Sequence, residues 1–378
     1  MVSQLELLLK QFTGECSRSR SSFLFSKRGM DDSQFHWLFV LMAGGFIIFL
    51  FAIFIGQGIA ANQMKQTAQM LEYFDSVFSS SQNLDNLNQP IQSTSSITIE
   101  QTCEPGVDSK LSFVGQSLDK KIAYTSLFSA AKVSGSTYAI KTIPYNAPFH
   151  VDNPIFLTDD MTLYIIYTND ADIASKYEAL LPSHATVVTT DDLSTITKRG
   201  FRDVVILSQS QDDFALEPDT VQKQLSPALR DNLRAVFVNT NTKNVFYSYG
   251  TKTANGFALF RPTDLHPGDD SIINSVDYTD DASLLGAIMS DAPTMYICNM
   301  QKLEARARMV ALQIAVRATE LEVVAGMDGR CIASYSAAHD QIMQGLQSPS
   351  NLLENFNWQD ELASQNNFLI TYSCPQLY

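Results

Sequence analysis

The longest apolar run of the chain lies near its N-terminus, between Trp37 and Ile55, and reads WLFVLMAGGFIIFLFAIFI. A helix rises about 1.5 Å per residue, so a run of this length can cross a hydrocarbon core of about 30 Å. The core helix of a soluble protein would show a polar stripe, and none is visible here. A cleaved secretory signal stays open as an alternative, because small residues follow at Gly58 to Ala61. The pattern predicts a transmembrane helix over residues 35–59, with the lipid bilayer as its partner.

An amphipathic stripe follows this run. Apolar residues recur every three to four positions, at Met64, Ala68, Leu71, Phe74 and Phe78. This spacing predicts that the helix continues and packs on the rest of the chain or on a second copy. The next stretch, Ser79–Ser96, is polar and has no period, which is typical of a linker. Residues 60–96 are therefore predicted to form a helical stalk and a polar linker.

Between Ile97 and Thr158 the apolar positions fall in short runs that are rich in β-branched and aromatic residues. These runs are SITIEQT, KLSFV, TYAIKTIPY and PIFLT. A turn signal at Glu104–Gly106 separates the first two. The pattern predicts a β-rich segment over residues 97–158 that forms a small antiparallel sheet.

From Thr162 onward, strand-like and helix-like patterns alternate. The strand-like runs are TLYIIYT, ATVVT, DVVILS and AVFVN, with helical patterns over Ile173–Leu181 and Thr220–Leu233 between them. Continuous apolar strands separated by helices are typical of a parallel sheet that is covered on both faces. A turn at Asn241–Asn244 joins AVFVN to VFYSY, which predicts an antiparallel extension at one edge.

The last part of the chain has mainly helical patterns. We expect a strand TMYIC, helices over Met300–Ala325, Cys331–Leu346 and Leu352–Ala363, and a final strand FLITYS. The predicted fold class is α/β: an N-terminal transmembrane helix, a small β-rich portion, and a domain over residues 159–378. That domain has a mostly parallel sheet and a helical C-terminal portion.

Basic residues place the N-terminus in the cytoplasm. Five of them precede the apolar run, while Lys65 alone follows closely, so the positive-inside rule predicts a cytoplasmic segment over residues 1–34 and an extracytoplasmic remainder. The chain has 40 acidic and 26 basic residues, of which the segment up to Gln34 holds four and five. The remainder therefore carries 36 acidic residues against 21 basic ones. This balance argues against nucleic acid as a partner.

Four of the five cysteines lie beyond the apolar run. They are Cys103, Cys298, Cys331 and Cys374. An even number outside the cytoplasm predicts two disulfide bonds, with free buried thiols as the alternative. The helix predicted from Met300 would be roughly 40 Å long and would separate Cys298 from Cys331, which disfavours a bond between those two. Pairing of Cys298 with Cys103 and pairing of Cys298 with Cys374 both stay open.

Polar residues follow three strands of the predicted parallel sheet. They are Asp170 and Asp172, then Ser208, then Asn239. Ligands of open parallel sheets bind beyond the carboxyl ends of the strands, so these four residues form the candidate ligand site. Asp170 as a helix cap and Asp172 in a first turn explain both carboxylates without a cation. We expect no metal and no cofactor.

The chain shows no catalytic motif. Its histidines have no HExxH spacing, and the GxSxG, GxGxxG and GxxxxGK patterns are absent. The sequence therefore predicts that the protein is not an enzyme.

Three stretches carry a resemblance to a known group of proteins. They are KRGMDDSQFHWLFVLMAGGFIIF, CNMQKLEARARMVALQI and SCPQLY. With these motifs the chain resembles uncharacterised single-pass membrane proteins of small-genome archaea, over most of its length from Lys27. The resemblance implies a cysteine-bearing exported domain, and it implies no activity or catalytic residue.

The triplet Lys27–Gly29 ahead of an apolar helix also resembles an archaeal prepilin cleavage site. Processing after Gly29 would make Met30 the new N-terminus and would place the helix in a filament core. The chain departs from the pilin pattern at Asp31–Asp32, which interrupt the approach to the apolar run, and at Gln34, where pilins usually have glutamate.

These patterns together predict a membrane-anchored interaction or scaffold protein of the cell envelope, whose partner is another envelope protein or a second copy. Two alternatives stay open. One is a pilin-like subunit processed after Gly29. The other is a small-ligand-binding or enzymatic α/β domain that uses the strand ends near Asp170.

Overall fold

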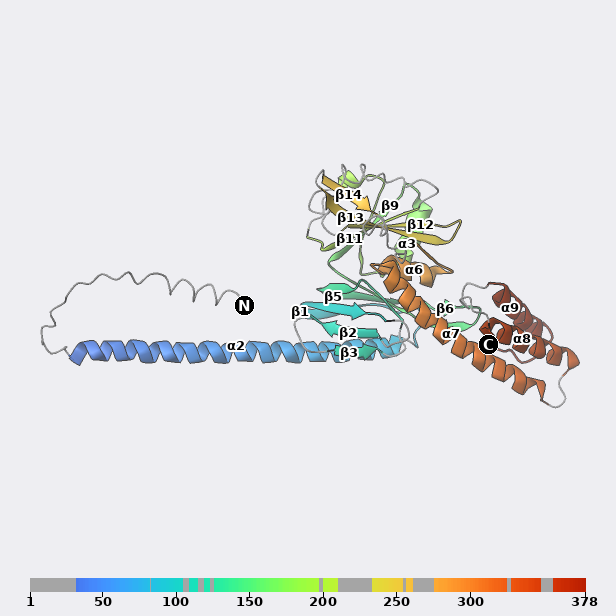
Figure 1. Ribbon diagram of the computed structural model, residues 1–378, viewed down its shortest axis with the longest axis horizontal. Helices are drawn as coiled ribbons and strands as arrows, with labels where there is room; N and C mark the ends of the chain where they lie inside the picture. The colour runs from blue at the N-terminus through green and yellow to red at the C-terminus, as the bar shows by residue number, and fades with distance from the viewer. Residues whose placement is uncertain are drawn as a thin grey trace. The chain divides into compact units, whose positions relative to one another are not determined.

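The structure is a computed structural model of the 378-residue chain. It describes residues 32–81, 83–104, 109–114, 119–122, 126–196, 200–209, 233–253, 256–260, 275–324, 328–347 and 356–378. The chain divides into two compact units, Met1–Gln63 and Met64–Tyr378, and each is described by itself. The elements appear in chain order in Figure 1. The predicted prepilin triplet Lys27–Gly29 lies outside the described residues.

Helix α2, Asp32–Ser81, contains the predicted apolar run (Figure 1). Its stretch Phe39–Gln57 has 19 residues and is long and apolar enough to cross a membrane. None of this stretch is buried in the protein. The helix continues past residue 59 without a break, as the amphipathic stripe predicted.

The last turns of α2 belong to the second unit and pack on its first sheet. Met70, Phe74, Val77 and Phe78 are buried in one apolar cluster with residues of that sheet. The ring of Phe74 meets the ring of Tyr138 edge-on, with 5.5 Å between the ring centroids. Edge-to-face pairs at this distance are favourable, so this contact fixes the helix end to the sheet.

The first sheet follows the order β3-β2-β1-β5-β8-β4. Its strands are β1 (Asn88–Thr102), β2 (Ser109–Phe113), β3 (Asp119–Ile122), β4 (Leu127–Phe128), β5 (Lys132–Thr142) and β8 (Ile155–Asp159). Neighbouring strands are antiparallel except β4 and β8, which are parallel. A separate small sheet pairs β6 (Tyr145–Asn146) with β7 (His150–Asp152).

Strand β1 begins inside the stretch that was predicted to be a linker. Ile91 is buried and pairs with Tyr138 of β5. Pro90 cannot donate a backbone hydrogen bond, so it is tolerated only where a strand has one neighbour. Among the described strands, this part of β1 pairs with β5 alone, because pairing with β2 starts at Ile99. The linker prediction is therefore wrong for residues 88–96, because one buried isoleucine and a strand partner override the polar composition.

The second sheet follows the order β10-β9-β11-β12-β13-β14, and β15 also pairs with β13. Its strands are β9 (Thr162–Tyr167), β10 (Thr186–Thr190), β11 (Asp203–Gln209), β12 (Leu233–Asn239), β13 (Asn244–Thr253), β14 (Gly256–Phe260) and β15 (Ser275–Asp277). The pairs among β9 to β12 are parallel, and the pairs that involve β13 are antiparallel.

This sheet confirms the predicted strands and the predicted hairpin, but its proportion of parallel to antiparallel strand pairs differs from the prediction. It is partly parallel and partly antiparallel rather than mostly parallel. The reversal occurs at the turn between Asn239 and Asn244, where Lys243 has φ 54°. The predicted helix between β9 and β10 is present as α3, Ala171–Leu180. The helix predicted over residues 220–232 lies outside the described residues.

Both faces of the second sheet are covered. Val205, Val236 and Tyr247 on one face belong to a large cluster that also contains residues of α6 (Asp281–Met289) and α7 (Pro293–Glu322). The opposite face carries a separate cluster, which includes Ile206 and Phe237. Strands buried on both faces are expected to be apolar along their whole length, which explains why they were recognisable in the sequence.

The predicted strand TMYIC is wrong, because these residues form the first turns of α7. Pro293 occupies the start of the helix, where its missing N–H has no helical partner in any case. Tyr296 and Cys298 are buried while Thr294 is exposed. A short buried segment of a helix contains the same apolar residue types as a buried strand, so the composition of TMYIC does not distinguish between them.

Helices α8 (Gly329–Gln347) and α9 (Phe356–Thr371) complete the chain. The predicted final strand FLITYS is also wrong, since Phe368 to Thr371 are the last turn of α9. Leu369 is buried in this turn, whereas Ile370 is 49% exposed. The run therefore has one buried side and one exposed side, as an amphipathic helix does.

Two disulfide bonds connect these elements. Cys103, just after β1, bonds Cys298 of α7, and Cys331 of α8 bonds Cys374. The prediction of two disulfides is confirmed, and of the two pairings left open the one with Cys103 and Cys298 is observed.

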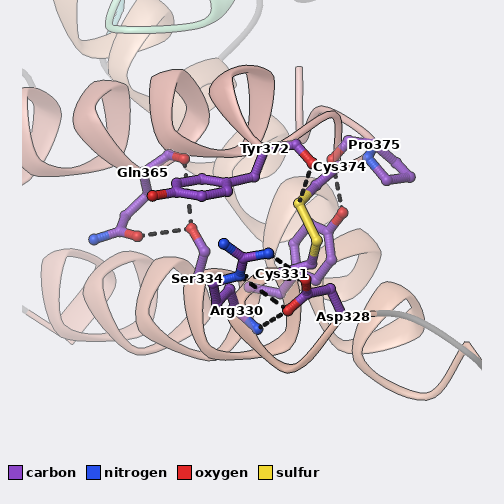
Figure 2. The surroundings of a disulfide bond; sticks show 9 residues. Asp328, Arg330, Cys331, Ser334, Gln365, Tyr372, Cys374 and Pro375 are labelled. Atoms are coloured by element: carbon purple, nitrogen blue, oxygen red, sulfur yellow. Dashed lines mark hydrogen bonds and ion pairs between the residues drawn. A yellow bond between two sulfur atoms is a disulfide. The ribbon is translucent and has the colours of Figure 1, made fainter.

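Short polar contacts surround the second disulfide (Figure 2). The guanidinium of Arg330 bonds Asp328 at 2.7 Å and lies over the ring of Tyr372, 4.6 Å from its centroid. Its hydrogen bonds hold the pKa of Asp328 at about 2. The hydroxyl of Tyr335 donates to the carbonyl of Pro375 at 2.7 Å. The chain after α9 is therefore held to α8 by polar contacts as well as by the disulfide.

Gly286, in the middle of α6, is expected to be intolerant of a side chain. A Cβ at this position would lie 2.8 Å from the ring of Phe128, which is fully buried. Gly286→Ala is expected to lower the free energy of unfolding by about 1–3 kcal/mol, because the added methyl group would force this buried ring to shift.

Gly329→Ala in α8 is the matched control, because nothing lies within 4 Å of its added Cβ. Urea unfolding curves of the two variants provide the measurement. Equal stability of both variants would show that Phe128 is not tightly held.

Candidate functional site

The predicted ligand site lies at the carboxyl ends of β9, β11 and β12, which are neighbours in the second sheet. The register places Ser208 beside Tyr167, the last residue of β9, and Gln209 beside Val238. The sheet therefore brings the predicted residues to one edge, as the parallel pattern required.

The two aspartates at this edge act as helix-start residues. Asp170 is the N-cap of α3, and its Oδ1 accepts the backbone N–H groups of Asp172 at 2.8 Å and Ile173 at 3.2 Å. Asp172 lies in the first turn of α3 and is exposed. Carboxylates in these positions stabilise a helix through its unpaired N–H groups and its dipole.

The other two residues have local roles as well. Ser208 is buried within β11. The Oδ1 of Asn239 accepts the backbone N–H groups of Asn241 at 3.0 Å and Thr242 at 3.1 Å, which closes the turn after β12. Within the described part of the chain, the side chains of Asp170, Asp172, Ser208 and Asn239 share no hydrogen bond with one another. The same part contains no group of three or more His, Cys, Asp or Glu residues placed to hold a metal ion.

A cavity of about 540 Å³ lies at the opposite edge of the second sheet, where the parallel strands begin. The starts of β9, β11 and β12 line it together with β5, the end of β8 and the segment after α6. Cavities of about 300–1,000 Å³ are typical of small-molecule sites. The structure therefore places this cavity at the edge that the sequence did not indicate.

One row of side chains across the sheet forms the floor of this cavity. Tyr164, Val205, Arg234 and Tyr249 are register partners on the neighbouring strands β9, β11, β12 and β13. Register partners on adjacent strands project from the same face of a sheet. All four residues line the cavity.

Arg234 is the cationic residue of this row and is only 8% exposed. Its Nη2 donates to the carbonyl of Ile288 in the last turn of α6 at 3.0 Å. Its Nη1 is buried and has no hydrogen-bond partner among the described residues. Across that same part of the chain, no carboxylate forms an ion pair with Arg234.

The second arginine of the cavity is in a different situation. The Nη2 of Arg202 lies 3.1 Å from Asp159 and 2.5 Å from Asp203, so two carboxylates offset its charge. Burial lowers the pKa of Arg202, but its bonds to Asp203 and Asp159 outweigh this effect and raise the pKa above its usual value. Burial also raises the pKa of Asp159, whose side chain is fully covered.

The two tyrosines of this row keep their protons. Burial raises the pKa of both Tyr164 and Tyr249 to about 12. The hydroxyl of Tyr249 donates to the carbonyl of Asp291 at 2.8 Å, and the hydroxyl of Tyr164 lies 3.0 Å from the Oγ1 of Thr158. The floor is therefore neutral apart from the guanidinium of Arg234.

Sequence reasoning missed this cavity because it followed the rule for the carboxyl edge of parallel sheets. One signal was present: Arg234 is the single charged residue of the strand LRAVFVN. A charged side chain inside a strand that is buried on both faces needs a partner, which marks it as a candidate site residue.

Comparisons of the chain with protein-family models, with curated proteins and with solved structures found no match.

Proposed function

We propose that this chain is a single-pass membrane protein that displays its disulfide-bonded α/β domain on the outer side of the membrane, as an interaction or scaffold domain of the cell envelope. The observation that carries the proposal is the stretch Phe39–Gln57, a helical run of 19 residues that is apolar enough to cross a membrane and of which none is buried. Phe46, Ile48 and Phe54 are each more than half exposed. Large apolar surfaces of this kind mark contact with lipid or with another protein.

Charge and cysteines support the proposed orientation. Basic residues concentrate before the helix, which favours a cytoplasmic N-terminus. The two disulfide bonds lie beyond the helix, and disulfides persist outside the reducing cytosol. An anchored domain meets the molecules of the same membrane surface, so its expected partner is another envelope protein or a second copy.

Charged substitutions in the apolar stretch test the anchor. Each arginine at the centre of a membrane helix costs about 2.5–3.5 kcal/mol of insertion free energy. The double variant Ile47→Arg with Phe51→Arg is therefore expected to shift the chain from carbonate-washed membranes to the soluble fraction. Gln57→Arg, at the end of the stretch, is the control and should stay in the membrane because its side chain reaches the interface.

The same preparations test the orientation and the interaction role. Protease added to whole cells should cut the chain beyond about residue 100 and spare the N-terminal segment. A short cross-linker applied to membranes should join the wild-type domain to an envelope protein or to a second copy. Wild-type chain in the soluble fraction, or a protected C-terminal domain, would contradict the proposal, and a domain that stays uncross-linked would contradict its interaction role.

A further inference from the structure

Arg234 lines the cavity, and no carboxylate of the described residues forms an ion pair with it. Arginine does not lose its proton in proteins, so the guanidinium stays charged although it is only 8% exposed. Its bond to the Ile288 carbonyl at the C-terminus of α6 offsets part of this charge, since helix C-termini carry partial negative charge. Its Nη1 has no bond among the described residues. Burial of a cation is costly unless an anion pairs with it.

Arg202 serves as an internal comparison. It lines the same cavity, and Asp159 and Asp203 lie within ion-pair distance of it. Two carboxylates therefore offset the charge of Arg202, whereas the third carboxylate of the lining, Asp291, forms no ion pair with Arg234 among the described residues. This contrast indicates that the anion for Arg234 comes from outside the described chain.

The other residues that line the cavity indicate which kind of anion can bind beside Arg234. Leu157, Val205 and Met289 line the cavity and are buried apolar residues. The lining also contains three carboxylates, which disfavour the higher charge and several oxygens of an inorganic phosphate ion more than a single carboxylate group. Helix α6 ends at Met289, which lines the cavity, so α6 offers carbonyl groups there rather than the N–H groups of a helix start that commonly bind phosphate.

We propose that this cavity binds a small organic carboxylate, with the carboxylate group on the guanidinium of Arg234 and an apolar body against Leu157, Val205 and Met289. Guanidinium and carboxylate groups match in a planar, charge-assisted geometry, which gives the contact both strength and direction. The volume of about 540 Å³ accommodates a molecule of this class. This ligand site does not depend on the membrane anchor. A negative result in the membrane experiment would not contradict carboxylate binding, and absence of carboxylate binding would not contradict the anchor.

The first test uses the wild-type full-length protein in lipid nanodiscs with methionine methyl groups labelled for NMR. Hexanoate is the probe, and hexan-1-ol, which has the same chain length without the charge, is its control. Hexanoate is expected to shift the methyl signal of Met289 in a saturable way and to leave the signal of Met309, which is 45% exposed on α7, unchanged. Met289→Leu assigns the signal.

The second test removes the cation. Loss of a charge-assisted bond is expected to weaken hexanoate binding by about tenfold or more in Arg234→Gln, with Arg234→Lys between that variant and the wild type. Asp172→Asn at the opposite edge of the sheet is the matched control and should bind hexanoate as the wild type does.

Three results would overturn the proposal: equal binding of hexanoate and hexan-1-ol, unchanged affinity in Arg234→Gln, or a Met289 signal that responds to inorganic phosphate and not to hexanoate. If Arg234→Gln does not fold, as judged by near-ultraviolet circular dichroism, the comparison of hexanoate, hexan-1-ol and phosphate on the wild type decides alone.

Discussion

Replacing Cys331 and Cys374 together with serine is expected to lower the free energy of unfolding by about 4 kcal/mol. The bond joins residues that are 43 positions apart, and its loss gives the unfolded chain back the entropy of that loop, which amounts to about 4 kcal/mol for a loop of this length. The bond ties the end of the chain after α9 to α8, so the loss should appear first in these two helices (Figure 2).

Guanidinium unfolding of the detergent-solubilised protein gives the measurement, with hydrogen exchange in α8 as the local readout. Cys16→Ser is the control, because it removes a thiol that lies on the other side of the apolar run. A double variant with wild-type stability would show that the polar contacts around Arg330 and Tyr335 hold these helices without the bond.

Phe74→Ala is expected to lower the free energy of unfolding by about 3–5 kcal/mol. The ring is 1% exposed and contacts Phe78 and Tyr138, with 5.5 Å between ring centroids in each pair. Truncation removes the transfer free energy of the ring and leaves a cavity between α2 and the first sheet.

Tyr73→Ala is the matched control on the same helix, because the side chain of Tyr73 lies next to Phe74 in the sequence and is 48% exposed. It should change stability by no more than about 0.5 kcal/mol. Thermal unfolding of both variants, followed by far-ultraviolet circular dichroism, separates the two positions. Similar losses in both variants would mean that helix propensity, rather than packing of Phe74, sets the stability of this segment.

Much of the second sheet was predictable because its strands are buried on both faces. The runs VVIL of β11 and AVFV of β12 contain only β-branched, aliphatic and aromatic residues. The disulfide pairing was half predictable, since the length of the helix predicted from Met300 disfavoured a bond between Cys298 and Cys331. Sequence spacing alone did not choose between Cys103 and Cys374 as the partner of Cys298.

Three elements were mispredicted for one common reason, which is that tertiary contacts decided them. TMYIC and FLITYS are short apolar runs whose composition suits a strand, but each packs as part of an amphipathic helix. Residues 88–96 are polar enough for a linker, yet β5 supplies a strand partner from elsewhere in the chain. Local composition does not contain the identity of a distant partner.

The candidate site shows the same limit. The sequence placed Asp170, Ser208 and Asn239 at one sheet edge, where the structure gives each a local or buried position. The cavity at the other edge depends on register between strands, which puts Tyr164 and Tyr249 in one row with Arg234. Register follows from packing over the whole sheet.

The bond between Cys103 and Cys298 closes a covalent ring that contains the entire second sheet and its cavity. A protease that cuts once between residues 104 and 297 therefore produces two fragments that remain joined, and both migrate as one species until a reductant is added. At a membrane surface such a nick would not shed the domain. Release of the nicked portion into the medium would require thiol exchange, so proteolysis and reduction would have to act together.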